Sequence, residues 1–169
     1  MQLENKVAAV TGGTAGIGKA IVEIFLENGA KVAMMARNSE KAEKVISDLG
    51  VGDRLIFIKG DATSQNDVEN FVDKTAEAFG TLDILVNNAG ITHDSLVFRM
   101  SNENWSKVIQ TNLSSNYQII KTLLPNMLSN KYGKIIGISS VVGSTGNPGQ
   151  ANYVASKSGM VGLYKSIAL

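Results

Sequence analysis

Five short apolar segments, separated by stretches with helical patterns, constrain the fold of this chain more than any other feature. The segments are Lys6–Thr11, Lys31–Ala36, Arg54–Lys59, Leu82–Val86 and Lys134–Ile138. Strands that are apolar throughout are buried on both faces, and in alternation with helices they are typical of a parallel sheet. The sequence therefore predicts an α/β fold: a doubly wound parallel sheet in three α/β/α layers.

The stretches between the strands predict the helices. The first strand is followed by a helical pattern that stops at Asn28–Gly29, and Ser64 has the position of an N-cap. No shift in composition, repeat or low-complexity segment marks a domain boundary, so we expect a single domain over residues 1–169. The other predicted helices cover 39–49, Ser64 to about Phe79, roughly 102–129 with a possible break near Pro125, and about Gln150 to the end of the chain.

Composition and charge argue against several classes of protein. With 169 residues, 44% of them hydrophobic, and a net charge of +1, the chain suits one soluble domain and gives no electrostatic case for nucleic acid or an anionic membrane. It has no cysteine and one histidine, His93, which leaves little basis for a metal site, and we assign His93 no role. The sequence shows no signal peptide or membrane-spanning stretch, and cysteine usage fits a reducing compartment, so we expect a cytoplasmic protein.

A glycine-rich loop lies between the first strand and its helix. Its pattern is Thr11-Gly12-x-x-x-Gly16-x-Gly18, which differs from the standard G-x-G-x-x-G spacing. Glycines let the backbone approach the pyrophosphate of a dinucleotide, and the following helix N-terminus offers unpaired N–H groups. The alternative is a tight turn without a ligand. The loop predicts a dinucleotide site in a Rossmann fold, formed by Gly12, Thr14, Ala15, Gly16, Ile17 and Gly18.

The end of the second strand bears on which dinucleotide is bound. About 20 residues after the glycines, the standard fingerprint has an acid for NAD, or a nearby arginine for the 2′-phosphate of NADP. Here the strand ends Ala36-Arg37-Asn38, so Arg37 could pair with the phosphate. Ala15 adds no second positive charge, and a solvated surface arginine is the alternative interpretation. We predict a preference for NADPH.

Tyr153 and Lys157 are four residues apart near the start of the last predicted helix. On a helix this spacing places both side chains on one face. An ammonium group beside a phenol favours the phenolate, and such a tyrosine can exchange a proton with a substrate oxygen. Ser139 and Ser140 lie upstream and offer a hydroxyl donor to the same oxygen. By itself, the pair could equally be an ordinary partly exposed pair on a helix.

Several motifs stand in one order along the chain, and the ordered set is highly specific. The motifs are Thr11-Gly12-x-x-x-Gly16-x-Gly18, Asp61, Asn87-Asn88-Ala89-Gly90, Asn112, Ser140 and Tyr153-x-x-x-Lys157. On these residues the whole chain resembles the classical short-chain dehydrogenase/reductase family. Within the family, residues 80–92 and 141–153 look most like the 3-oxoacyl-(acyl-carrier-protein) reductases of type II fatty acid synthesis.

The resemblance implies catalytic roles for four residues. Tyr153 is expected to be the general acid for carbonyl reduction, and Lys157 to assist it and to hold the nicotinamide ribose; both are expected to contact the cofactor. Ser140, thirteen residues before Tyr153, is expected to hydrogen-bond the substrate carbonyl, with Ser139 as the competing candidate. Asn112 is expected to support a water-linked proton relay to Lys157, with a structural amide as the alternative.

The resemblance also implies cofactor contacts outside the glycine loop. Asp61 is expected to contact the adenine amino group, with Ala62 beside it, although Asp61 could simply open the next helix. The segment after the fourth strand is expected to line the cofactor through Asn88, Ala89 and Gly90, with Asn87 more structural.

The activity implied by the resemblance is NADPH-dependent reduction of a 3-oxoacyl thioester, carried by an acyl carrier protein, to the (3R)-3-hydroxyacyl form. A homo-oligomer, expected to be a tetramer, is implied as well, without a metal, nucleic acid or membrane. Lys131 lies where the carrier-protein reductases have a basic docking residue, but one surface lysine is a weak signal. Two alternatives remain: a relative acting on a small ketone, sugar or steroid, and a non-catalytic nucleotide-binding fragment.

The chain departs from the family at its end. The sequence stops at Leu169 inside a predicted helix, and five strands are found where the doubly wound dinucleotide fold has six. The family continues with further strands and a substrate-covering region. We therefore expect one dinucleotide-binding and catalytic domain, incomplete at its C-terminus.

Overall fold

The computed structural model describes residues 1–169 and contains one sheet of five strands in the order β3-β2-β1-β4-β5. All neighbouring strands are parallel, as the pairing of Ala9 with Ala33 and with Leu85 illustrates for the central strand. The doubly wound parallel sheet predicted from the sequence is confirmed. The strands are β1 (Val7–Thr11), β2 (Lys31–Ala36), β3 (Leu55–Lys59), β4 (Ile84–Asn87) and β5 (Lys134–Gly137).

The helices begin and end at local signals. The Ser64 side chain accepts a hydrogen bond from the backbone N–H of Asp67, which confirms the predicted N-cap. The first helix stops at Asn28, where Gly29 has a φ of +93°. The helices are α1 (Gly16–Glu27), α2 (Ser39–Leu49), α3 (Gln65–Phe79), α4 (Asn102–Ile109), α5 (Ser115–Ser129), α6 (Val142–Thr145) and α7 (Ala151–Ile167), with 3₁₀ turns at Gly52–Arg54 and Val97–Arg99.

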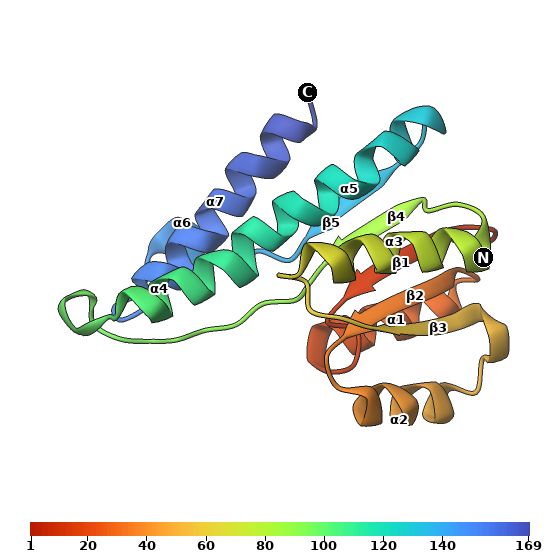
Figure 1. Cartoon of the computed structure of the whole chain (residues 1–169), viewed down its shortest axis with the longest axis horizontal. Coiled ribbons are helices and arrows are strands. Elements are labelled where there is room, and N and C mark those ends of the chain that lie inside the picture. Colours follow the sequence, from red (N-terminus) through yellow and green to blue (C-terminus); the bar gives the residue numbers. More distant parts are fainter.

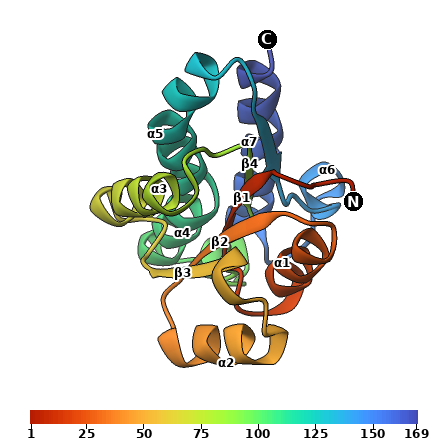
Figure 2. The ribbon, with the colours of Figure 1, turned by 90° about the vertical axis from the view of Figure 1, so that its right-hand side faces the viewer.

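The core has two halves, one on each face of the sheet. Successive strand residues alternate between them: Ala9 packs in the cluster with α3 and α5, whereas Val10 packs in the cluster with α1 and α2. Figure 1 shows the ribbon, and Figure 2 shows α3 and α5 on one side of the sheet and α1 on the other. None of the helices combines the length and the apolar character needed to cross a membrane.

The helical stretch expected over 102–129, with a possible break near Pro125, needs a correction. Pro125 lies inside α5 and does not break it, whereas a π-helical turn, Gln110–Ser114, interrupts the stretch earlier. Side chains take over carbonyls at this turn: Asn116 Nδ2 donates to the carbonyl of Asn112 at 2.9 Å, and Ser115 donates to that of Thr111. A π turn is tolerated where such partners replace regular helical bonds, and it is frequent at functional sites.

Candidate active site

A hollow of about 730 Å³ lies at the carboxyl edge of the sheet. The strand order reverses beside β1, and ligands of open α/β sheets bind at this kind of edge. Segments that follow β1 to β4, together with parts of α4 and the π turn, form the wall. The predicted cofactor residues that line the hollow are Gly12, Thr14, Ala15, Ile17, Arg37, Asp61, Ala62, Asn88, Ala89 and Gly90.

The glycine loop after β1 is tight because Gly12 and Gly18, two glycines of the motif, leave no room for a side chain. Gly12 has a φ of +68°, and a Cβ there would lie 2.9 Å from Nδ2 of Asn88. A Cβ on Gly18 would overlap the carbonyl oxygen of Gly12. Gly16 has open space around it and a φ of +52°, so its requirement is conformational. Gly16 and Gly18 complete the loop without lining the hollow.

The N-terminus of α1 suits an anionic group. Ala15 is its N-cap residue, and no side-chain hydrogen bond caps the first turn. The first N–H groups of a helix have no partner within the helix, and the dipole is positive at this end. Since Thr14, Ala15 and Ile17 line the hollow beside this turn, the chain fits the pyrophosphate of a dinucleotide here.

Asn88 holds the glycine loop against the end of β4. Its Nδ2 donates to the carbonyls of Thr11 and Gly12, at 3.1 and 3.2 Å. The Thr11 hydroxyl oxygen in turn accepts from the backbone N–H groups of Asn88 and Ala89, at 3.0 and 3.1 Å. Asn88 thus has a structural function in addition to lining the hollow.

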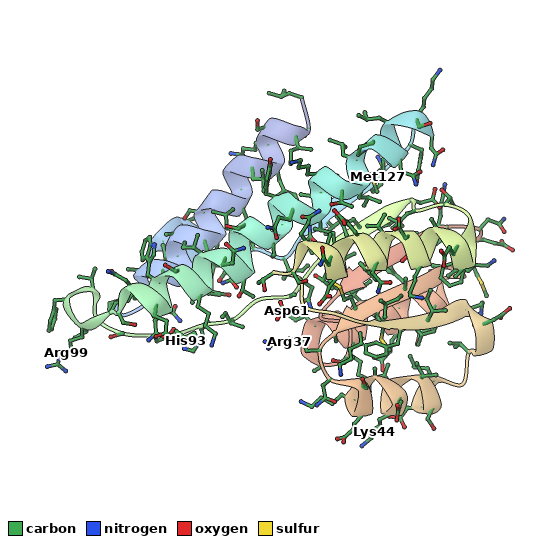
Figure 3. All side chains as sticks on the ribbon, in the orientation of Figure 1. Arg37, Lys44, Asp61, His93, Arg99 and Met127 are labelled. Atoms are coloured by element: carbon green, nitrogen blue, oxygen red, sulfur yellow. The ribbon has the colours of Figure 1, made fainter.

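Arg37 and Asp61 lie together where β2 and β3 end (Figure 3). Arg37 Nη1 is 3.7 Å from Asp61 Oδ2, and the two side chains are 73% and 39% exposed. Burial by itself would raise the pKa of Asp61, but hydrogen bonds from Thr63 and the charge of Arg37 outweigh it, so that this pKa is lowered. An exposed pair at this distance is weak. The guanidinium therefore remains able to bind a phosphate.

Lys157 is buried beside Tyr153 on α7. Its Nζ lies 5.6 Å from the centre of the Tyr153 ring and donates a 2.6 Å hydrogen bond to the carbonyl of Ile138. The residue is 5% exposed, and burial lowers the pKa of its ammonium group. The predicted helical face thus brings the two side chains together, and the carbonyl end of β5 anchors the lysine.

The two serines after β5 have different surroundings. The Ser139 hydroxyl donates to the carbonyl of Lys157 at 3.2 Å, which ties the end of β5 to α7. The Ser140 hydroxyl makes no hydrogen bond within the chain, and only its backbone carbonyl is engaged, by the N–H of Gly143. Ser140 is therefore the serine whose hydroxyl is free for a substrate.

Asn112 lies in the π turn and is fully buried. Its side chain accepts from the N–H of Ile91 at 2.8 Å and donates to the Ile91 carbonyl at 2.9 Å and the Ser156 hydroxyl at 3.1 Å. A Cβ on Gly90 would lie 3.3 Å from Asn112 Oδ1 and 3.7 Å from Lys157 Nζ. The structure therefore gathers Asn112 and Lys157 behind Gly90, and the four catalytic candidates themselves do not line the hollow.

Two polar residues that support this site were missed in the sequence. Tyr164 Oη accepts from Asn87 Nδ2 at 2.8 Å and donates to Asn116 Oδ1 at 2.7 Å. Burial raises the pKa of Tyr164 to about 12, although the hydrogen bond from Asn87 opposes the shift. The helical spacing held a signal, since Asn116 is one turn after Asn112 and Tyr164 is two turns after Lys157.

Comparison with known proteins finds a matching family model and related reductases. Residues 6–169 match the family model for short chain dehydrogenases. The chain is 45% identical over 166 residues to the 3-oxoacyl-(acyl-carrier-protein) reductase FabG of Haemophilus influenzae, with 98% of this chain and 68% of the relative covered. The FabG proteins of Escherichia coli and Vibrio cholerae are 43% and 46% identical over 168 residues, with 99% of this chain and 68% of each relative covered.

Proposed function

We propose that this chain, which belongs to the short-chain dehydrogenase family, reduces a 3-oxoacyl thioester to its (3R)-3-hydroxyacyl form with NADPH. The substrate is carried by an acyl carrier protein in type II fatty acid synthesis. The similarity to relatives named 3-oxoacyl-(acyl-carrier-protein) reductase supports this substrate class. The observation that carries the proposal is the cluster of Lys157, Tyr153 and Asn112 behind the hollow that follows the strand ends.

The hollow supports the choice of cofactor. The glycine loop and the N-terminus of α1 would hold the pyrophosphate, and Asp61 with Ala62 would lie at the adenine. Arg37 would bind the 2′-phosphate, for which its exposed guanidinium is free to turn. Asn88, Ala89 and Gly90 would line the remaining length. The hydride is the chemistry that bound NADPH supplies, and the chain contributes binding, orientation and a proton.

Two side chains act on the substrate carbonyl in this proposal, and Lys157 and Asn112 support them. Tyr153 donates its phenolic proton to the oxygen on which negative charge develops, and the free hydroxyl of Ser140 donates a hydrogen bond to the same oxygen. Lys157 stabilises the phenolate that remains on Tyr153 and holds the ribose. Lys157 supplies the proton that Tyr153 has lost. Asn112 orders the surroundings of Lys157 through its hydrogen bonds to the backbone of Ile91.

The partners belong to the same proposal. The enzyme acts on a carrier-bound substrate as a homo-oligomer, a tetramer in the family pattern, in the cytoplasm. Exposed apolar side chains on the helices beyond the sheet, among them Trp105, Leu128 and Val161, support self-association.

Steady-state oxidation of NADPH with an acetoacetyl thioester tests the function. We expect a kcat/KM for the thioester well above that for simple ketones and sugars, and turnover that depends on Tyr153. A higher kcat/KM for a simple ketone or sugar would overturn the substrate assignment and leave a reductase of another specificity. Tight NADPH binding without reduction of any carbonyl would overturn the enzymatic function itself.

A further inference from the structure

The ring of Tyr164 fills the space that the absent side chain of Gly137 leaves beside the sheet. Tyr164 belongs to α7, and its ring packs against Gly137 at the end of β5, where a Cβ would lie 2.6 Å from Cζ of the ring. Any other residue at position 137 would therefore displace the tyrosine. The Tyr164 hydroxyl reaches past β5 to Asn87, the last residue of β4.

The hydroxyl belongs to a chain of hydrogen bonds that runs in one direction. Asn87 Nδ2 donates to Tyr164 Oη at 2.8 Å, and Tyr164 donates to Asn116 Oδ1 at 2.7 Å. Asn116 Nδ2 then donates to the backbone carbonyl of Asn112 at 2.9 Å. An amide N–H₂ only donates and an amide oxygen only accepts, so each group has one allowed orientation. Bonds aligned in this way strengthen one another in a buried site.

This series of hydrogen bonds ends at the π turn, where the helical hydrogen bonding is irregular. The carbonyl of Asn112 lies in the π turn Gln110–Ser114. The side chain of Asn112 hydrogen-bonds both the backbone N–H and the carbonyl of Ile91. The adjacent Gly90 lies beside Lys157 Nζ. A shift of the π turn would therefore move the wall next to the catalytic lysine.

We infer that Tyr164 is a positioning residue for this active site: through Asn116 it fixes the π turn at Asn112, and thereby the Gly90–Ile91 segment against Lys157. The inference rests on the proposed function for its effect on catalysis. Asn87, Asn112 and Asn116 are at most 3% exposed, so water cannot easily replace the tyrosine hydroxyl. Burial raises the pKa of Tyr164 to about 12, so this hydroxyl stays protonated and able to donate well above neutral pH.

The test is Tyr164→Phe, which removes the hydroxyl and keeps the ring beside Gly137. Tyr117→Phe is the matched control, since Tyr117 is the neighbour of Asn116 on α5, is 52% exposed and makes no side-chain hydrogen bond. We expect Tyr164→Phe to lower kcat about 10- to 100-fold with KM for NADPH changed less than about threefold, because misplaced catalytic groups affect the chemical step most. Tyr117→Phe should stay within about twofold of the parent.

A double-mutant cycle separates the hydrogen-bonded chain from general loosening. Asn116→Leu should lower kcat to a similar degree, and the double variant Tyr164→Phe/Asn116→Leu should be no slower than the worse single variant. Multiplied losses in kcat would contradict a single connected chain.

Amide hydrogen exchange measures the local stability of the π turn and needs no enzymatic turnover. Tyr164→Phe should increase exchange selectively in Gln110–Ser114, whereas Tyr117→Phe should not. If the parent reduces no thioester, the proposed function fails, and hydrogen exchange still decides the inference. Unchanged exchange in Gln110–Ser114 of the Tyr164→Phe variant would overturn the inference, whatever happens to kcat.

Discussion

Lys157 donates a 2.6 Å hydrogen bond from its Nζ to the backbone carbonyl of Ile138. This contact fixes the lysine at the end of β5, and no carboxylate lies within ion-pair distance of it. A buried ammonium group without a counter-ion is unfavourable for stability. Its position beside Tyr153 and behind Gly90 explains why a chain would retain it.

Replacing Tyr153 by Phe removes the proposed proton donor and little else. We expect kcat to fall about 10²- to 10⁴-fold, the range associated with loss of a general acid. The Kd for NADPH, measured by the change in its fluorescence, should stay within about threefold, because the glycine loop is untouched. A variant that reduces the thioester nearly as fast as the parent would rule out this role for Tyr153.

Lys157→Met should change how stability depends on pH. Burial lowers the pKa of Lys157 in the folded state, so between that value and the unfolded value of about 10.4 the unfolded chain binds more protons. The stability of the parent therefore rises with pH through this window, as the desolvation cost of the ammonium disappears. The free energy of unfolding of Lys157→Met minus that of the parent should therefore fall as the pH is raised from about 7 to about 10. Urea unfolding at both pH values measures this difference.

The exposed lysine of the same helix provides the control for that experiment. Lys165→Met removes a charge from the surface of α7 and should show the same stability difference from the parent at both pH values. If Lys157→Met behaved like Lys165→Met, the burial cost assigned to Lys157 would be wrong.

Arg37→Ala should change cofactor preference without affecting the fold. The pair with Asp61 is exposed and 3.7 Å long, so its loss should change the free energy of unfolding by less than about 1 kcal/mol. The KM for NADPH should rise about 10-fold or more and that for NADH little, because one charge-assisted contact to the 2′-phosphate is lost. Equal kcat/KM values for NADPH and NADH in the parent would contradict the preference.

Gly18→Ala and Gly162→Ala should have opposite effects although the chemical change is the same. A Cβ on Gly18 meets the carbonyl of Gly12, whereas a Cβ on Gly162, inside α7, meets nothing within 4 Å. We expect Gly18→Ala to cost about 1–3 kcal/mol and to weaken NADPH binding. Gly162→Ala should add about 0.5–1 kcal/mol through helix propensity. Thermal unfolding with and without NADPH measures both, and equal shifts would contradict the packing of the loop.

Several parts of the candidate site were predictable because their signals are local. The glycine loop is predicted from the spacing of glycines after a strand. Helical geometry predicts that Tyr153 and Lys157 lie on one face of the helix. The possible break near Pro125 was not found, and the irregularity lies instead at Gln110–Ser114, where the side chain of Asn112 bonds to Ile91 on another segment. No pattern in the helix itself contains that partner.

By itself, the sequence determined the alternation of strands and helices, the helix ends at residues such as Ser64 and Gly29, and the presence of a glycine loop after the first strand. These depend on side-chain periodicity and backbone freedom within a few residues. Only the tertiary structure decided which carbonyl holds Lys157, which serine hydroxyl is free, and that Tyr164 bonds to Asn87, 77 residues away in the chain. Contacts of that range form only when the sheet brings strand ends and helices together, because each buried polar group must then find its partner among whatever the fold has placed beside it.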